Sequence, residues 1–144
     1  MTETTTIVEA LGGKSVLKKK ISTPMELSET IREGLPYASL EALVSKLRLP
    51  RNEAAAALKF SERTLARRRR EKRFRPDESD RVLRLARLFA LATRILESEE
   101  NAAKWFSRHN RALGGKSPLD LIDTEIGARE AETVLWRVAY GMFS

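Results

Sequence analysis

The chain has 144 residues, no cysteine and a formal net charge of +7 at pH 7. This length is sufficient to bury a hydrophobic core, and the lack of cysteine excludes a disulfide framework, a thiolate zinc site and a cysteine nucleophile. No apolar run approaches the roughly 20 residues that span a bilayer, and the N-terminus lacks the charged-then-apolar order of a signal peptide, so we expect a cytoplasmic protein that contacts no membrane.

Caps and apolar periodicity predict helices along the chain, and no stretch alternates at the strand period over strand length. We therefore predict an all-α fold with a loosely structured N-terminus, in which residues 16–21 form a short extended piece. The first capped helix begins at Thr23 and ends at Gly34. Ser39 is expected to cap a second helix, and a short Ala-rich helix follows over residues 53–58.

The second half of the chain continues the pattern of caps. Ser61 is predicted to cap the next helix, Pro76 to open the longest one, Ser98 to cap a short one and Ser117 to cap another. The last helix is predicted over residues 125–140. Its expected inward-facing residues are Ile126, Val134, Leu135 and Val138. A hinge near Pro76 would divide the chain into an N-terminal domain, residues 1–75, and a helical C-terminal domain, residues 76–144.

The positive charge is concentrated in the middle of the chain. Residues 51–100 carry 14 basic and 9 acidic side chains, a net of +5, whereas residues 1–50 (7 and 6) and 101–144 (6 and 5) each carry a net of +1. A local excess of this kind indicates a segment that binds a polyanion, rather than a general adaptation for solubility.

Residues 51–73 are typical of a helix-turn-helix, with the Ala-rich helix, a turn over 59–61 and a second helix over 62–73. In this motif the second helix enters the major groove of DNA. At about 100° per residue, one face opposite Leu65 has Arg63, Ala66, Arg67, Arg70 and Arg73. The predicted DNA-binding residues are Ser61, Arg63, Thr64, Ala66, Arg67, Arg70 and Arg73. Two departures from the motif are Lys59, where the turn usually has glycine, and Arg68, where an inward apolar residue is common.

The hexapeptide Ala-Leu-Gly-Gly-Lys-Ser occurs twice, at residues 10–15 and 112–117. A phosphate-binding loop requires glycine five positions before the second glycine of this segment, and Val8 and Asn110 stand there instead. We therefore interpret both copies as loops that turn on their glycines, and we predict no cofactor.

No group of residues indicates catalysis. His109 is the single histidine and has no carboxylate cluster near it in the sequence, so we predict no metal site. Asp120, Asp123 and Glu125 lie around helix starts, where capping explains them. We therefore predict no catalytic residue and a protein that is not an enzyme. The residues expected in the core include Phe89, Trp105, Phe106 and Trp136.

Several segments, in their order and spacing, resemble the MbcA/ParS/Xre antitoxins, which are partners of RES-domain toxins. They are residues 34–36, 61–68, 78–87, 110–121 and 123–130, followed by Tyr140-Gly141. The departures are Lys59, where the family has a turn glycine, and Arg75, where it has a small capping residue.

This resemblance implies an N-terminal helix-turn-helix half and a C-terminal toxin-binding half. It implies a type II toxin–antitoxin system whose toxin degrades NAD⁺ and is held inactive by this protein. It also implies repression of the protein's own operon through operator DNA. A two-fold dimer would then read two half-sites within a larger toxin–antitoxin complex.

The C-terminal residues are the candidate toxin contacts. Trp136 and Tyr140 are one helical turn apart and therefore share a face, and Gly141 is expected to end the helix. The predicted toxin-binding residues are Trp136, Arg137, Tyr140, Gly141, Met142, Phe143 and Ser144. Two alternatives remain open: the tail folds back on the protein's own core, or the protein is a stand-alone dimeric repressor without a toxin.

Overall fold

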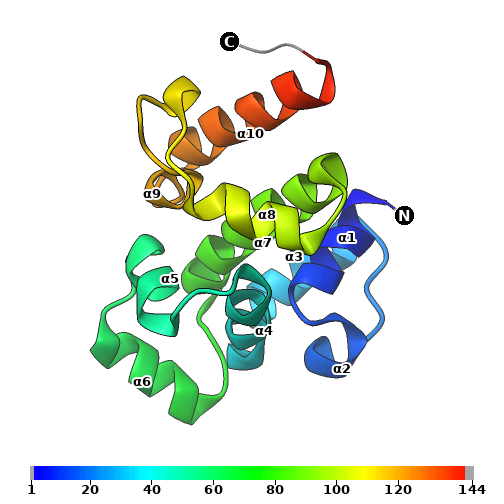
Figure 1. Ribbon diagram of the computed structural model, residues 1–144. Helices are drawn as coiled ribbons and strands as arrows, with labels where there is room; N and C mark the ends of the chain where they lie inside the picture. Colours follow the sequence, from blue (N-terminus) through cyan, green and yellow to red (C-terminus); the bar gives the residue numbers. More distant parts are fainter. Residues whose placement is uncertain (1, 142–144) are drawn as a thin grey trace.

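Residues 2–141, which the computed structural model describes, form an all-α structure, as the sequence predicts (Figure 1). Within these residues the β-type pairing is limited to two isolated bridges, between Pro36 and Arg73 and between Asn110 and Lys116. In the same part of the chain, no helix has the length and apolar character needed to cross a membrane. The elements are α1 (Glu3–Ala10), α2 (Gly13–Leu17), α3 (Pro24–Glu33), α4 (Tyr37–Leu47), α5 (Arg51–Ala57), α6 (Glu62–Glu71), α7 (Pro76–Leu96), α8 (Glu99–Ser107), η1, a 3₁₀ helix (Arg111–Leu113), α9 (Pro118–Leu121) and α10 (Glu125–Ala139).

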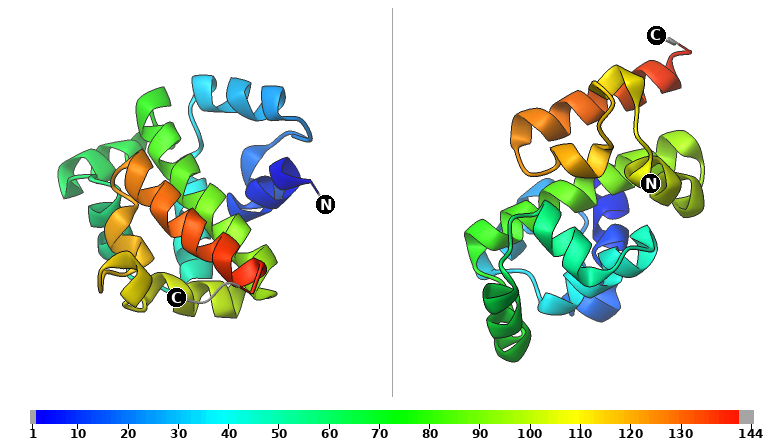
Figure 2. Two further views of the ribbon diagram at one scale, coloured as in Figure 1. Left: turned by 90° about the horizontal axis from the view of Figure 1, so that it is seen from above. Right: turned by 60° about the vertical axis from the view of Figure 1, so that its left-hand side comes forward.

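The longest helix, α7, is the centre of the fold. It packs against α1 and α3 from the N-terminal part of the chain and against α8 and α10 from the C-terminal part. Figure 2 shows α10 lying along α7, with α6 at the opposite end of the molecule from α10. Pro76 opens α7 as predicted, and the helix then continues to Leu96. Both predicted halves therefore pack on one shared helix.

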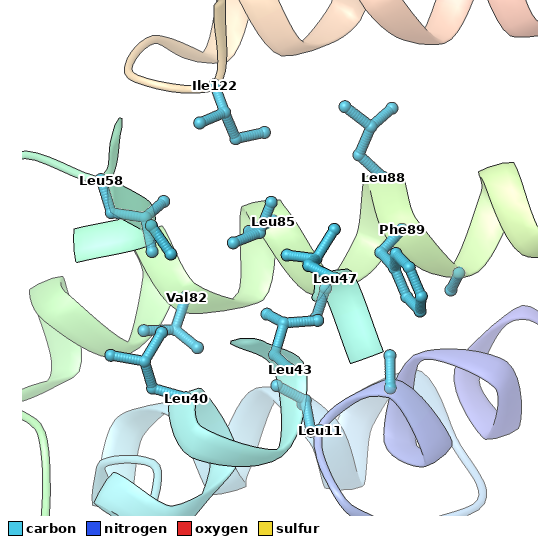
Figure 3. Close-up of a cluster of buried hydrophobic side chains, with 14 of the residues drawn as sticks. Leu11, Leu40, Leu43, Leu47, Leu58, Val82, Leu85, Leu88, Phe89 and Ile122 are labelled. Atoms are coloured by element: carbon cyan, nitrogen blue, oxygen red, sulfur yellow. The ribbon is translucent and has the colours of Figure 1, made fainter. Parts of the chain in front are cut away.

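The hydrophobic core surrounds the inner face of α7. Val82, Leu85 and Phe89 are fully buried and meet leucines of α4, while Ile122 closes the cluster from the side of α9 (Figure 3). Burying one such side chain stabilises the fold by about 1.5–3 kcal/mol. Because Leu11 joins the same cluster, the N-terminal helices share this core.

The N-terminus is helical, contrary to the sequence-based expectation. The Thr2 hydroxyl caps α1 by accepting a hydrogen bond from the backbone N–H of Thr5. Ile7 and Val8 are buried. Residues 16–21 are not an extended piece either, because Val16 belongs to α2 and Lys18 then takes a φ of 63°. The threonine-rich first turn has low helix propensity, and packing of α1 against α7 outweighs that preference.

The local caps are confirmed with one exception. Thr23 and Glu26 form a reciprocal capping box at the start of α3. Ser117 and Asp120 do the same at the start of α9. Ser39, however, does not cap α4, because that helix begins two residues earlier at Tyr37. The Ser39 hydroxyl is instead buried inside the first turns of α4 and has no hydrogen-bond partner.

Candidate functional site

The helices α5 and α6 and the turn between them form the predicted helix-turn-helix. The Ser61 hydroxyl caps α6 by accepting a hydrogen bond of 3.1 Å from the backbone N–H of Thr64. Lys59 has a φ of 64°, the left-handed conformation for which a turn usually uses glycine. The lysine therefore keeps the backbone geometry of the motif, at a local cost of about 1–2 kcal/mol.

The predicted DNA-reading side of α6 faces solvent. Arg63, Ala66, Arg67 and Arg70 are exposed, and Leu65 is buried on the other side of the helix. The guanidinium groups of Arg63, Arg67 and Arg70 therefore surround the small side chain of Ala66. Such a surface can enter a groove, because arginine pairs bidentately with guanine or with phosphate.

Arg73 lies outside this helical face, so its predicted place on α6 is wrong. The helix ends at Glu71, and Lys72 takes a φ of 65°. The chain then pairs with the segment after α3, and the Arg73 side chain donates a 2.6 Å hydrogen bond to the carbonyl oxygen of Gly34. The two segments approach so closely that a Cβ atom on Gly34 would lie 2.2 Å from the Phe74 carbonyl oxygen.

Arg68 anchors α6 through a buried ion pair. It points inward, where the motif commonly has an apolar residue, and is only 3% exposed. Its Nε donates to Glu78 Oε1 at 2.6 Å, and one Nη donates to Glu71 at 2.9 Å. Burial by itself raises the pKa of Glu78, but the hydrogen bonds from Arg68 and from the Arg75 backbone, together with both guanidinium charges, bring the pKa below its usual value.

A second arginine, Arg81 of α7, holds the turn of the motif. Its Nη1 donates to the carbonyl oxygens of Leu58 and Lys59 at 3.1 and 3.2 Å. Its guanidinium carbon also lies 4.5 Å from the centroid of the Phe60 ring, a cation–π distance. Phe60 in turn stacks on Phe74. Sequence inspection did not single out Arg81, because only the tertiary fold brings α7 to the end of α5.

The connection between α9 and α10 contacts α7 and the turn of the helix-turn-helix. Arg84 Nη1 donates to the carbonyl oxygen of Ile122 at 3.1 Å, and Lys59 Nζ lies 3.7 Å from an oxygen of Asp123. One turn further along α7, Arg87 pairs with Glu125 in the first turn of α10. The helix-turn-helix and the C-terminal helices are therefore in direct contact.

Exposed apolar side chains gather on α10. Among the described residues, the large exposed hydrophobic side chains are Met25 on α3 and four residues on or just after α10. Those four are Ile126 (77% exposed), Trp136 (38%), Val138 (37%) and Tyr140 (72%). The predicted inward positions of Ile126 and Val138 are wrong, as is the expected core position of Trp136. Val134 and Leu135 are buried as predicted.

The end of α10 has the predicted aromatic pair. The rings of Trp136 and Tyr140 stack with their centroids 5.9 Å apart. Arg137 is exposed beside them, and Gly141 has a φ of 69°, which ends the helix. Met142, Phe143 and Ser144, also predicted to contact a toxin, lie outside the described residues.

Two protein-family models match consecutive parts of the chain. The Antitoxin Xre-like helix-turn-helix domain matches residues 26–87, and the Antitoxin Xre/MbcA/ParS C-terminal toxin-binding domain matches residues 91–141. Antitoxin Xre of Yersinia enterocolitica serotype O:8 / biotype 1B is 31% identical over 120 residues, which cover 82% of this chain and 81% of the relative. The chain belongs to the Xre/MbcA/ParS antitoxin family.

Other relatives agree with this assignment. Antitoxin Xre of Photorhabdus laumondii is 27% identical over 125 residues, covering 85% of this chain and 84% of the relative. A Sphingobium protein named Prs ADP-ribosylating antitoxin is 27% identical over 133 residues, with the same two coverages. The resemblance seen in the sequence is confirmed, and the protein is an antitoxin of a type II toxin–antitoxin system.

His109 and Asp120 lie outside the helix-turn-helix and outside α10. His109 is exposed, and the described residues contain no group of three or more residues that could hold a metal ion. Asp120 accepts a hydrogen bond from the backbone N–H of Ser117, which lowers the pKa of its carboxyl group. The glycines of both Gly-Gly-Lys-Ser copies have positive φ. Only the second copy forms the predicted loop, because residues 13–15 of the first copy belong to α2.

Proposed function

We propose that the antitoxin binds operator DNA through α6 and an NAD⁺-consuming RES-type toxin through α10, and that the complex represses its own operon. The observation that carries this proposal is the separation of two accessible surfaces. The helix α6, which has the exposed arginines, and the helix α10, which has the exposed apolar residues, lie at opposite ends of the molecule in Figure 1 and in the right view of Figure 2. One antitoxin can therefore contact DNA and toxin together, in the cytoplasm where both are present.

The DNA-binding part of the proposal rests on the exposed arginines and on how rigidly they are held. The Ser61 cap and the Arg68–Glu78 ion pair hold α6, and the contacts of Arg81 hold the turn before it. Groups that are fixed before binding lose little conformational freedom on binding. One helix offers few base contacts, so we infer a homodimer that reads half-sites about 34 Å apart, or a multiple of that distance.

Substituting Arg67 or Arg70 with alanine is expected to weaken operator binding by about 1–3 kcal/mol each, because each would lose contacts to base edges. The measurement is a gel shift or fluorescence anisotropy titration with a duplex from the promoter of the antitoxin's own operon. Arg129→Ala, which removes an exposed arginine from α10, is the matched control and should leave the affinity unchanged. Equal affinities for all three variants and the parent would contradict the assignment of α6.

The toxin-binding part of the proposal rests on the apolar face of α10. Aromatic side chains are typical anchors at the centres of protein interfaces. Beside Trp136 lies an open cavity of about 390 Å³ lined by Arg87, Arg129, Glu132 and Thr133. We infer that this surface, together with Arg137, Gly141 and residues 142–144, covers the toxin's active site. This face also favours an antitoxin over the alternative of a stand-alone repressor, which would have no partner for it.

The toxin's activity provides the direct test of the proposal. Purified toxin from the adjacent gene is expected to consume NAD⁺, and titration with the full-length antitoxin should reduce that consumption to background at a stoichiometric ratio. A stable complex that still consumes NAD⁺ at the full rate would contradict inhibition by occlusion. Failure of the two proteins to associate would favour the stand-alone repressor.

The name of the Sphingobium relative, Prs ADP-ribosylating antitoxin, suggests a second reaction for the toxin. In both reactions the bond between ADP-ribose and nicotinamide breaks and nicotinamide leaves. Such a toxin would transfer the ADP-ribose to a protein, whereas hydrolysis transfers it to water. The same assay separates the two reactions, because NAD⁺ labelled in its ADP-ribose part leaves the label on protein in one reaction and in free solution in the other.

A further inference from the structure

Basic side chains continue beyond α6 at the same end of the molecule. Lys18, Lys19 and Lys20 follow α2, and Lys72 and Arg73 follow α6. Lys18, Lys20, Lys72 and Arg73 are exposed. None of these four side chains forms an ion pair with another residue among those the structure describes.

Contacts with the end of α3 connect the two clusters. Lys19 Nζ lies 2.6 Å from a carboxylate oxygen of Glu33, and Arg73 donates to the carbonyl oxygen of the next residue, Gly34. The hydrogen bond and charge of Lys19, with a smaller contribution from the charge of Arg73, lower the pKa of Glu33. Glu33 therefore lies between the two clusters and forms its ion pair with Lys19, not with any of the four exposed cations.

We propose that Lys18, Lys20, Lys72 and Arg73, here called the basic band, form a second DNA contact that holds the phosphate backbone beside the groove read by α6. The proposal rests on the proposed DNA binding by α6. It gives Arg73 a role that differs from the predicted one: the residue lies past the helix, so it meets backbone rather than base edges. Lysine suits such a contact because its ammonium group is a point charge that grips phosphate without reading sequence.

The position of the basic band favours DNA over the toxin as its partner. The residues of the band follow α2 and α6, and Figure 1 shows both helices on the side of the molecule away from α10. Lys18 and Lys72 each follow a helix C-terminus, where a cation is favourable for the helix dipole alone. Lys20 lies in the open connection before α3 and has no such local explanation.

The test is the salt dependence of DNA binding by full-length antitoxin. Each phosphate contact contributes about −0.9 to the slope of log K against log salt concentration. The double variant Lys18→Gln/Lys20→Gln should therefore have a slope less steep by about two. If parent and variant bind equally at 1 M salt, where such contacts are screened, each lost contact weakens binding about eightfold at 0.1 M salt. The loss should be equal on the promoter duplex and on an unrelated duplex of the same length, because backbone contacts carry no sequence information.

The matched control is Lys104→Gln/Lys116→Gln, which removes the same charge from two exposed positions in the C-terminal half. This control should keep the parent slope. An unchanged slope in the Lys18/Lys20 variant would overturn the proposal, and so would an equal change in the control, which would indicate a net-charge effect. Loss of toxin affinity with normal DNA binding would also overturn it and would assign these lysines to the toxin.

The Arg67→Ala variant separates this proposal from the one on which it rests. If Arg67→Ala loses promoter binding while Lys18→Gln/Lys20→Gln keeps the parent slope, α6 binds DNA and only the basic band is refuted. If the parent protein, alone and with its toxin, binds neither duplex at low salt, both proposals fail together.

Discussion

Replacing Arg68 with alanine is expected to lower the free energy of unfolding by about 3–5 kcal/mol. The substitution leaves the carboxylate of Glu78 buried without its guanidinium partner, and an uncompensated buried charge has a cost of this size. Thermal or urea denaturation followed by circular dichroism measures the change. Arg69→Ala is the matched control: it removes the neighbouring, exposed arginine and should change stability by no more than about 0.5 kcal/mol.

The same ion pair predicts how stability depends on pH. Because the pKa of Glu78 is lowered in the folded state, its ionised form contributes stability above the unfolded-state pKa, and this contribution is lost as the pH falls through the folded-state pKa. A Glu78→Gln variant lacks this titration and should lose less stability than the parent on acidification below about pH 5. A parent and variant with parallel stability curves from neutral to acidic pH would contradict the inferred role of Glu78.

Tyr140→Ala is expected to weaken binding of the toxin by at least about 2 kcal/mol, roughly 30-fold in affinity. The ring is 72% exposed and stacks on Trp136, so its removal deletes interface area and an aromatic neighbour. Calorimetric titration of the toxin measures the affinity. Stability should change little, because the side chain makes few contacts in the free protein.

Met25→Ala provides a control of the same chemical kind. Met25 is 69% exposed but lies on α3, outside the proposed toxin surface, so its substitution should leave toxin affinity unchanged. Deleting residues 142–144 tests the predicted contribution of the tail separately. Parent affinity in the Tyr140→Ala variant would require the toxin to bind elsewhere, and parent affinity in the deletion alone would restrict the interface to α10.

Sequence reasoning succeeded where the signal was local. The Thr23–Glu26 capping box and the Ser61 cap depend on residues three positions apart, so they can be read directly from the sequence. The exposed face of α6 also follows from periodicity, because the helix has only Leu65 as an apolar residue to direct inward. At Lys59 the turn has the left-handed backbone conformation of the motif, although the glycine that usually takes this conformation is absent.

The failures concern tertiary context. On α10 the small residues Ala128 and Ala131 share the buried face with Leu135. Ile126 lies roughly 200° around the helix from Ala128 and therefore faces solvent. A prediction that weights large apolar residues assigns the wrong face in such a helix. The predicted end of α6 is wrong for a related reason. Lys72 has no sequence signal for left-handed backbone, and the residues after the helix pair with a segment distant in sequence, through Phe74 N–H to Leu35 and Tyr37 N–H to Lys72.

The arginines spaced three residues apart along α7 have a consequence for how this family can exchange its parts. The two family models meet inside α7, between residues 87 and 91, so a recombination event there would join the helix-turn-helix domain of one ancestor to the toxin-binding domain of another. The hybrid would inherit Arg84 and Arg87 from one parent and their partners, the Ile122 carbonyl and Glu125, from the other. Only parents that share this docking geometry would give folded hybrids, so new toxin specificities should be acquired mainly by substitution on the outer face of α10.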